Sequence, residues 1–328
     1  MTKAILEVDN LQVVYPTPRG EVYALRGISL SVEAGQIYGI VGESGCGKST
    51  IGRAIIGLVP PPGKVTNGRV LYHGEDLIKK DEKELRSLRG RRISMVFQDP
   101  AAALNPLFTI GQQLMAIMNR HRIPSREQRA MELLEDLGLP NPQDILSSYS
   151  HQLSGGQQQR AMIAMALCTE PDLMIADEPT SCLDVTIQSQ ILDLLVKLRE
   201  ERGVTILLIT HDLGVVAETC DQVAVFYLGS IVEEGTCRDI FRNPRHPYTR
   251  GLLAALPNPQ SWGTPLKVIP GSIPTNLQPT PGCAFASRCD QATQVCHEVN
   301  PPFIGFGGTH RVSCHRYAKL TTTQGVTP

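Results

Sequence analysis

The chain has 328 residues, enough for about two domains of roughly 150 residues each. Its 31 Lys and Arg residues nearly balance its 32 Asp and Glu residues, and this net charge of −1 argues against a broad nucleic-acid footprint, which needs surplus positive charge. Hydrophobic residues make up 41% of the chain, which excludes wholesale disorder.

No stretch approaches the roughly 18 consecutive apolar residues of a helix that crosses a bilayer. The first ten residues, MTKAILEVDN, lack the charged start and long apolar run of a signal peptide. We therefore expect a soluble chain in the cytosol. In that reducing compartment, the nine cysteines are not expected to form disulfides.

Short strands joined by turns are predicted for the first 80 residues, as an antiparallel β start that includes ILEVDNLQVVY and EVYALRGISLSVEAG. The apolar run 36–41, which glycines bound on both sides, predicts a buried strand. The helical spacing of residues 48–58 predicts a helix that stops at the prolines that follow. Residues 92–97 predict a second buried strand.

Helices are predicted from Ile110 to Leu139, where Ser125 and Gln128 have the spacing of a capping box. Beyond Gln157 the pattern alternates between helix and strand, which calls for parallel strands with crossover helices. The alternating segments are a helix to Cys168, a strand over 173–176, a helix over 186–201 and a strand over 205–210.

The composition changes beyond about Ile240, because nine prolines lie between residues 241 and 282. This density excludes long helices and predicts an extended connector. The tail after Tyr317 is expected to be loose.

A phosphate-binding motif lies between the first buried strand and the helix after it, where residues 42–49 (GESGCGKS) fit the pattern G-x-x-x-x-G-K-[ST]. Its glycines let backbone N–H groups curl around phosphates, Lys48 reaches the β and γ oxygens, and Ser49 offers its hydroxyl oxygen to Mg²⁺. The residues predicted to contact the nucleotide are Gly42, Ser44, Gly45, Cys46, Gly47, Lys48, Ser49 and Thr50.

Two acids follow the predicted strand 173–176 at its C-terminal end, where α/β sheets place their ligands. Asp177 is predicted to hold Mg²⁺, and Glu178 is predicted to polarise the water that attacks the nucleotide. A hydrophobic run that ends in Asp-Glu is common by itself. Together with the phosphate-binding motif, however, it predicts a site of nucleotide hydrolysis.

The sequence LSGGQ at residues 153–157 completes a set of motifs that resembles the ATP-binding-cassette (ABC) ATPases over residues 4–240. The resemblance implies an α/β fold, namely an ABC-type P-loop NTPase with a RecA-like core and an antiparallel β subdomain. It also implies a helical subdomain over about residues 100–165. The ATPase domain would then span residues 1–240, followed by a small Pro- and Cys-rich C-terminal extension over residues 241–328.

In this family the LSGGQ stretch closes over ATP that is bound to the opposite subunit. The resemblance therefore assigns Ser154, Gly155, Gly156 and Gln157 to the nucleotide of a partner subunit. Asp184 matches a residue of the family's loop that crosses the dimer interface.

Three further residues match the family's nucleotide site. Tyr15 matches the aromatic residue that stacks on adenine, although Tyr23 lies nearby in the sequence. Gln98 matches a glutamine that touches Mg²⁺ and water, and His211 matches a histidine that contacts the γ-phosphate. The resemblance thus assigns hydrolysis to Lys48, Gln98, Glu178 and His211, and Mg²⁺ to Ser49, Gln98 and Asp177.

Two more stretches resemble the ATPases of oligopeptide and dipeptide importers, namely residues 98–106 (QDPAAALNP) and residues 243–249 (NPRHPYT). The resemblance implies a peripheral subunit at the cytoplasmic face of the cell membrane that hydrolyses ATP to power the import of di- or oligopeptides. The same branch handles nickel, glutathione and related solutes, so the peptide is an expectation from the family.

Importers of this branch usually combine two different ATPases with two membrane-spanning permease subunits and an extracytoplasmic solute-binding protein. We therefore expect a heterodimer with a paralogous ABC ATPase and no nucleic-acid partner. The sequence GRRISMVFQDP slightly favours the first ATPase of the pair, whereas GESGCGKST favours the second. The alternative is a soluble ABC-type ATPase that acts on nucleic acid or ribosomes, but such proteins usually carry two cassettes or long coiled-coil inserts.

Four of the cysteines fall close together in the extension, as Cys283, Cys289, Cys296 and Cys314. Four thiolates in a segment too short for its own core would staple a small subdomain. Their spacing lacks the CxxC pairs of zinc ribbons, so zinc is less favoured than a 4Fe–4S cluster, which some members that resemble this chain carry at these positions. Zinc and free thiols stay open as alternatives.

Overall fold

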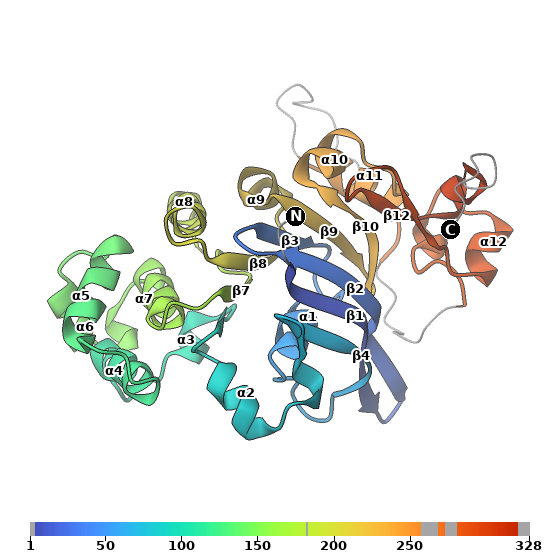
Figure 1. Ribbon diagram of the computed structural model, residues 1–328. Helices are drawn as coiled ribbons and strands as arrows, with labels where there is room; N and C mark the ends of the chain where they lie inside the picture. Colours follow the sequence, from blue (N-terminus) through green and yellow to red (C-terminus); the bar gives the residue numbers. More distant parts are fainter. Residues whose placement is uncertain (1–3, 182, 257–267, 273–280, 321–328) are drawn as a thin grey trace.

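A computed structural model of the chain describes residues 4–181, 183–256, 268–272 and 281–320. Two β-sheets lie at its centre, and helices surround them (Figure 1). Among the described residues, no helix combines the length and the apolar character needed to cross a membrane. Much of the predicted connector and the end of the predicted loose tail lie outside the described residues.

The smaller sheet is antiparallel, as the sequence predicts for the first 80 residues, with strands in the order β2-β1-β4-β5. Its strands are β1 (Ala4–Thr17), β2 (Gly20–Glu33), β4 (Lys64–Tyr72) and β5 (Glu75–Asp76). The first two strands have 14 residues each, and β1 extends beyond the predicted stretch ILEVDNLQVVY at both ends. Shifts of pairing register between Val8 and Leu11 interrupt β1, and such bulges let a long strand bend and twist.

The larger sheet has eight strands, in the order β11-β12-β10-β9-β3-β8-β7-β6. Its strands are β3 (Ile37–Val41), β6 (Ile93–Val96), β7 (Leu173–Asp177), β8 (Thr205–Thr210), β9 (Gln222–Tyr227), β10 (Ser230–Thr236), β11 (Phe303–Gly305) and β12 (Arg311–Ser313). The five strands from β9 to β6 are parallel and include all four predicted buried strands. This arrangement confirms the predicted α/β fold class.

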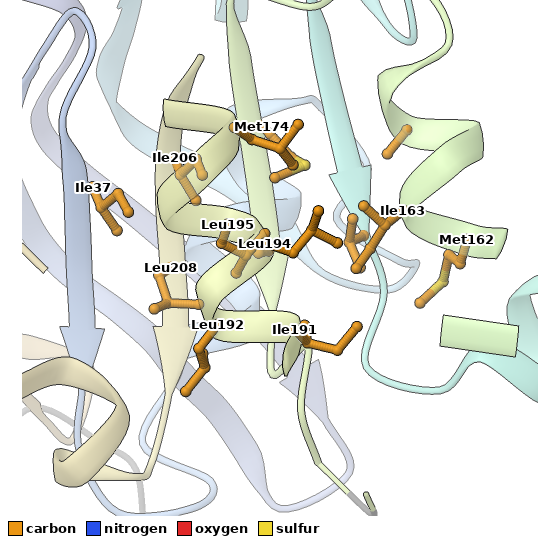
Figure 2. Packing of buried hydrophobic residues seen from close by; sticks show 14 of the residues in the cluster. Ile37, Met162, Ile163, Met174, Ile191, Leu192, Leu194, Leu195, Ile206 and Leu208 are labelled. Carbon is orange, nitrogen blue, oxygen red and sulfur yellow. The ribbon is translucent and has the colours of Figure 1, made fainter. Parts of the chain in front are cut away.

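The central strands are apolar throughout because both faces of the larger sheet are covered. Side chains alternate along β8, so that Ile206 and Leu208 face one side while Leu207 and Ile209 face the other. In Figure 2, helix α8 (Val185–Arg202) lays its buried side chains over Ile206 and Leu208. Helices α7 (Gly155–Leu167) and α9 (Leu213–Thr219) belong to this same side, whereas α1 (Lys48–Ile55) and the antiparallel sheet cover the opposite side.

Between β6 and β7 the chain forms a group of helices, seen at the left of Figure 1. They are α3 (Pro100–Ala103), α4 (Ile110–Arg120), α5 (Arg126–Asp136), α6 (Pro142–Ser147) and the N-terminal part of α7, while α2 (Glu82–Leu88) precedes β6. The capping box predicted at Ser125 is wrong. Ser125 has a left-handed backbone with φ +47°, which leaves its side chain without a cap hydrogen bond, and Gln128 donates instead to Glu132.

The extension adds two strands to the larger sheet, because β12 pairs with β10 and β11 pairs with β12. Helix α10 (Cys237–Arg242) leads into the extension, whose helices are α11 (Pro247–Ala254) and α12 (Gln294–Glu298), with short 3-10 helices at Ala286–Arg288 and His315–Leu320. Fully buried Glu233 of β10 accepts hydrogen bonds from the backbone N–H groups of Arg245 and His246 and lies 2.9 Å from His310 Nε2. The described part of the extension is therefore joined to the larger sheet by strand pairing and by buried polar contacts.

Candidate active site

The phosphate-binding loop connects β3 to α1, and at two of its glycines a side chain would clash with neighbouring backbone atoms. Gly47 has φ +103°, which a larger residue rarely adopts, and a Cβ there would clash with the carbonyl oxygen of Ala24. A Cβ on Gly42 would clash with the carbonyl oxygen of Phe226. The loop therefore takes its shape from glycine and directs the N-terminus of α1 at the pocket beside it.

Lys48 and Ser49 begin α1 and lie where the motif predicts them. Lys48 is 4% exposed, and its Nζ donates to the carbonyl oxygens of Gly42 (2.8 Å) and Glu43 (3.0 Å). Ser49 Oγ donates to Asp177 Oδ1 at 2.8 Å, which brings together two residues that are 128 positions apart.

Asp177 ends β7 and is 1% exposed. Burial raises the pKa of Asp177, while the hydrogen bond from Ser49 and the charge of Arg53 oppose that shift. Hydroxyl, carboxylate and amide oxygens are the ligands that Mg²⁺ prefers. The side chains of Ser49, Asp177 and Gln98 therefore fit a Mg²⁺ ion.

Three predicted side chains meet just after β7. Glu178 Oε2 accepts a hydrogen bond from Gln98 Nε2 at 2.7 Å, and Glu178 Oε1 lies 3.2 Å from His211 Nδ1. Glu178 has φ +47°, a left-handed backbone that costs a non-glycine residue about 1–3 kcal/mol. Its N–H donates to the carbonyl of Ile209 on the neighbouring strand, which helps to hold this backbone. The carboxylate is thus fixed from two sides.

A pocket of about 280 Å³ lies beside the loop. It is lined by Tyr23, Ala24, residues 44–50, Gln98, Glu178, Leu228 and Gly229. Tyr15 does not line this pocket, since its ring lies against Gly63, where an added Cβ would clash with it. The sequence did not indicate Ala24, Leu228 or Gly229. The signal for the last two is a turn between two short apolar strands, at which Gly229 N–H donates to the carbonyl of Cys46 at 2.8 Å.

The LSGGQ stretch does not reach this pocket within the chain. Ser154 caps α7 and forms a capping box with Gln157, while Ser154 and Gly155 stay exposed. Asp184 caps α8 and is also exposed. The predicted residues therefore form two separate sets, one around the pocket and one on the surface.

The four cysteines of the extension lie near one another. Burial raises the pKa of Cys283 to about 11, and the charges of Cys314, Cys296 and Cys289 add to that rise. Cys283 N–H also donates to the carbonyl of Cys296 at 2.8 Å. Among the described residues, no three His, Cys, Asp or Glu side chains are arranged to hold a single metal ion.

The histidines of the extension have other partners. His310 faces Glu233, and His315 Nε2 lies 2.7 Å from the carbonyl oxygen of Val299.

Known families match two parts of the chain. Residues 25–181 match the family described as ABC transporter, and residues 232–296 match the C-terminal region of oligopeptide/dipeptide transporters. The dipeptide transport ATP-binding protein DppD of Bacillus subtilis (strain 168) is 48% identical over 314 residues, which cover 94% of each chain. The oligopeptide transport ATP-binding protein OppD of the same organism is 46% identical and covers 94% of this chain and 87% of its own.

Solved structures share the ATPase fold. A dimeric ATP-binding cassette in a post-hydrolysis state, bound to ADP and Pi, is 32% identical with a TM-score of 0.65. The match covers 71% of this chain and 99% of that one.

Proposed function

The chain belongs to the ABC transporter family of ATPases, and from that premise we propose that it hydrolyses ATP to power the import of di- or oligopeptides. Two relatives named for dipeptide and oligopeptide transport support the solute class, as does the match of its C-terminal region. The observation that carries the enzymatic part is the convergence of Gln98, Glu178 and His211 beside the phosphate-binding loop.

In the proposed mechanism, the side chains act mainly by positioning and by charge. Ser49, Asp177 and Gln98 would hold Mg²⁺, which offsets the negative charge of the β- and γ-phosphates. Lys48 releases the loop carbonyls to donate to the phosphate oxygens. Glu178, held by Gln98 and His211, accepts a hydrogen bond from the attacking water, and His211 turns toward the γ-phosphate.

A second subunit completes each site in this proposal. The exposed Ser154 and Gly155, with the half-buried Gly156 and Gln157, would close over the ATP of a paralogous ATPase, with Asp184 at the interface. The helix N-terminus at Ser154 suits this role because its free N–H groups favour an anion. The ATPase domain would span residues 1–240 and the extension residues 241–328.

The membrane partners would meet the chain beside Gln98. Leu107 is 79% exposed and Phe108 is 49% exposed, and both lie in the segment 99–115 that follows it. Large exposed apolar side chains often mark a protein interface. We assign this segment to contact with two permease subunits, at the cytoplasmic face of the membrane, and through them to coupling with an extracytoplasmic solute-binding protein.

Uptake in cells tests the proposed solute. The gene is deleted and replaced by the wild-type chain or by Glu178→Gln, and the uptake of labelled dipeptides, labelled oligopeptides, nickel and glutathione is measured. We expect the wild-type chain, and not the variant, to restore peptide uptake. Restoration of nickel or glutathione uptake alone would contradict the peptide assignment.

We further propose that Cys283, Cys289, Cys296 and Cys314 hold a 4Fe–4S cluster. The mutual effect of their charges on the Cys283 thiol supports a shared site. A zinc ion brings its sulfur ligands to about 2.3 Å from one metal atom, whereas a cluster binds each thiolate through a different iron and spaces them more widely. The spacing of the four cysteines, which lacks the CxxC pairs of zinc ribbons, favours the cluster over zinc.

Anaerobic purification tests the cluster without reference to ATPase activity. We expect brown protein with about four iron and four sulfide per chain, and loss of the colour in Cys296→Ser. The matched control is Cys220→Ser, since Cys220 is a buried cysteine beside β3 that is not one of the four. Colourless wild-type protein without bound iron would contradict the proposal.

A further inference from the structure

Glu43 belongs to the phosphate-binding loop but does not line the nucleotide pocket. Its carbonyl oxygen accepts a hydrogen bond from Lys48 Nζ. Its other polar groups turn toward the extension, because its N–H donates to Tyr248 Oη of α11 at 3.0 Å and its carboxylate meets Arg288. The loop is therefore attached to the extension through a residue that does not line the pocket.

Arg288 holds the Glu43 carboxylate with two nitrogens, at 2.8 Å and 3.2 Å. The two residues are 245 positions apart, and the Arg288 side chain is only 5% exposed. Arg288 Nε also donates to the carbonyl of Pro270 at 3.0 Å, which fixes the guanidinium within the extension. A paired, buried guanidinium of this kind is strongly oriented.

Aromatic rings pack beside this ion pair. Tyr227, at the end of β9, lies with its ring centroid 4.7 Å from Tyr248 and 5.2 Å from Phe285. Tyr248 and Phe285 are 5.3 Å apart, and all three are buried. The guanidinium of Arg288 lies 5.8 Å from the Tyr227 ring centroid. These rings link the central sheet, α11 and the turn that carries Arg288 into one packed unit.

We propose that Arg288 is a positioning residue for ATP, through which the C-terminal extension holds the phosphate-binding loop in its binding shape by way of Glu43. The proposal goes beyond the transport function and needs only that the loop binds ATP. The loop grips phosphates with backbone N–H groups, so its affinity depends on how often those groups are correctly arranged. Arg288 and Tyr248 hold the entrance of the loop at Glu43, two residues before the Gly45-Cys46-Gly47 turn.

The expected kinetic effect follows from the fraction of molecules whose loop has the ATP-binding shape. If loss of the ion pair leaves about a tenth of the loops in the binding shape, the apparent Kd and KM for ATP rise about tenfold. The kcat value stays within about twofold, because bound ATP restores the same site. A purely structural role would act differently, since it lowers the fraction of folded protein and therefore the apparent kcat at an unchanged KM.

The test measures Mg-ATP binding and steady-state hydrolysis of the full-length chain in its assembled complex. We expect Arg288→Gln and Glu43→Gln each to raise KM and Kd about tenfold, and Arg288→Lys to raise them less, since it keeps the charge but loses the paired geometry. Glu43→Gln leaves the extension unchanged and so tests the contact even if Arg288→Gln fails to fold. Arg242→Gln, on the exposed end of α10, is the matched control and should leave both values unchanged.

The double variant decides whether the two residues act through one contact. Glu43→Gln combined with Arg288→Gln should raise KM about tenfold, as each single change does, and not about a hundredfold. A hundredfold rise would overturn the proposal because the residues would then act independently. Loss of kcat at an unchanged KM in both single variants would overturn it as well.

Discussion

The phosphate-binding loop and the C-terminal extension show two ways in which one sequence builds one site. The loop is eight contiguous residues, and its fixed positions, Gly42, Gly47, Lys48 and Ser49, follow from the chemistry of phosphate binding. The extension contributes Arg288 and Tyr248, which reach the same loop from more than 200 positions away. The residues that bind phosphate are thus encoded by one short motif. The contacts that hold the loop in place depend instead on the packing of residues that are distant in the sequence.

The largest expected effect comes from a substitution that stops hydrolysis but leaves the contacts between the loop and the extension in place. Glu178→Gln should keep ATP binding but lower turnover about a thousandfold, because the amide cannot accept a proton from water. Steady-state hydrolysis and ATP binding measure the two parts separately. Glu218→Gln, an exposed change on α9, is the control, and near-normal hydrolysis by Glu178→Gln would show that another group is the base.

The next effect comes from a substitution that weakens the contacts between the extension and the larger sheet but leaves the catalytic side chains unchanged. Glu233→Ala leaves two N–H groups and His310 without their buried acceptor, so the free energy of unfolding should fall by about 3 kcal/mol. Urea unfolding measures this loss, with Glu218→Ala as the control. An unchanged unfolding midpoint would mean that the extension is not joined to the ATPase fold in the way described.

Acid should lower the stability of the contact between the extension and the larger sheet, where His246 lies beside Glu233. Burial lowers the pKa of His246 to about 3, while an unfolded histidine keeps a pKa near 6.5. As the pH falls below about 6.5, the unfolded chain gains a proton that the folded chain refuses, so stability falls by about 1.4 kcal/mol per pH unit toward pH 3. His246→Asn keeps an acceptor for the Tyr248 N–H and should flatten this dependence. Equal slopes for both proteins between pH 6.5 and pH 5 would contradict the assignment.

The smallest expected effect distinguishes Tyr15 from Tyr23 as the residue that contacts adenine. Tyr15 is proposed to stack on adenine, which predicts that Tyr15→Ala raises the KM for ATP about threefold. Tyr23→Ala is the comparison variant, because Tyr23 lines the pocket beside the loop. If only Tyr23→Ala raises KM, the adenine contact belongs to Tyr23.

Much of the fold and of the nucleotide site could be predicted because the relevant signals are short. Buried parallel strands are apolar throughout, so β3, β6, β7 and β8 stand out in the sequence. The side chains at their C-terminal ends then meet at one edge of the sheet, which is why Asp177 and Ser49 could be placed together.

The sequence did not predict features that depend on backbone conformation, on very short strands or on contacts between residues far apart in the chain. Ser125 has the right partner spacing for a cap but a left-handed backbone, which the spacing does not reveal. Strands β11 and β12 have three residues each, too few to show a period. The pairing of Arg288 with Glu43 has no local pattern at all, since either residue would pass for an ordinary surface charge.

Affinity isolation from native membranes tests most directly whether this ATPase drives a membrane importer. Tagged Glu178→Gln protein is isolated from detergent-solubilised membranes in the presence of ATP, and its partners are identified by mass spectrometry. We predict that a second ABC ATPase and two multi-spanning permease subunits are recovered with it. Recovery of ribosomal or DNA-associated proteins alone would contradict the transport function and would assign the ATPase to a soluble machine.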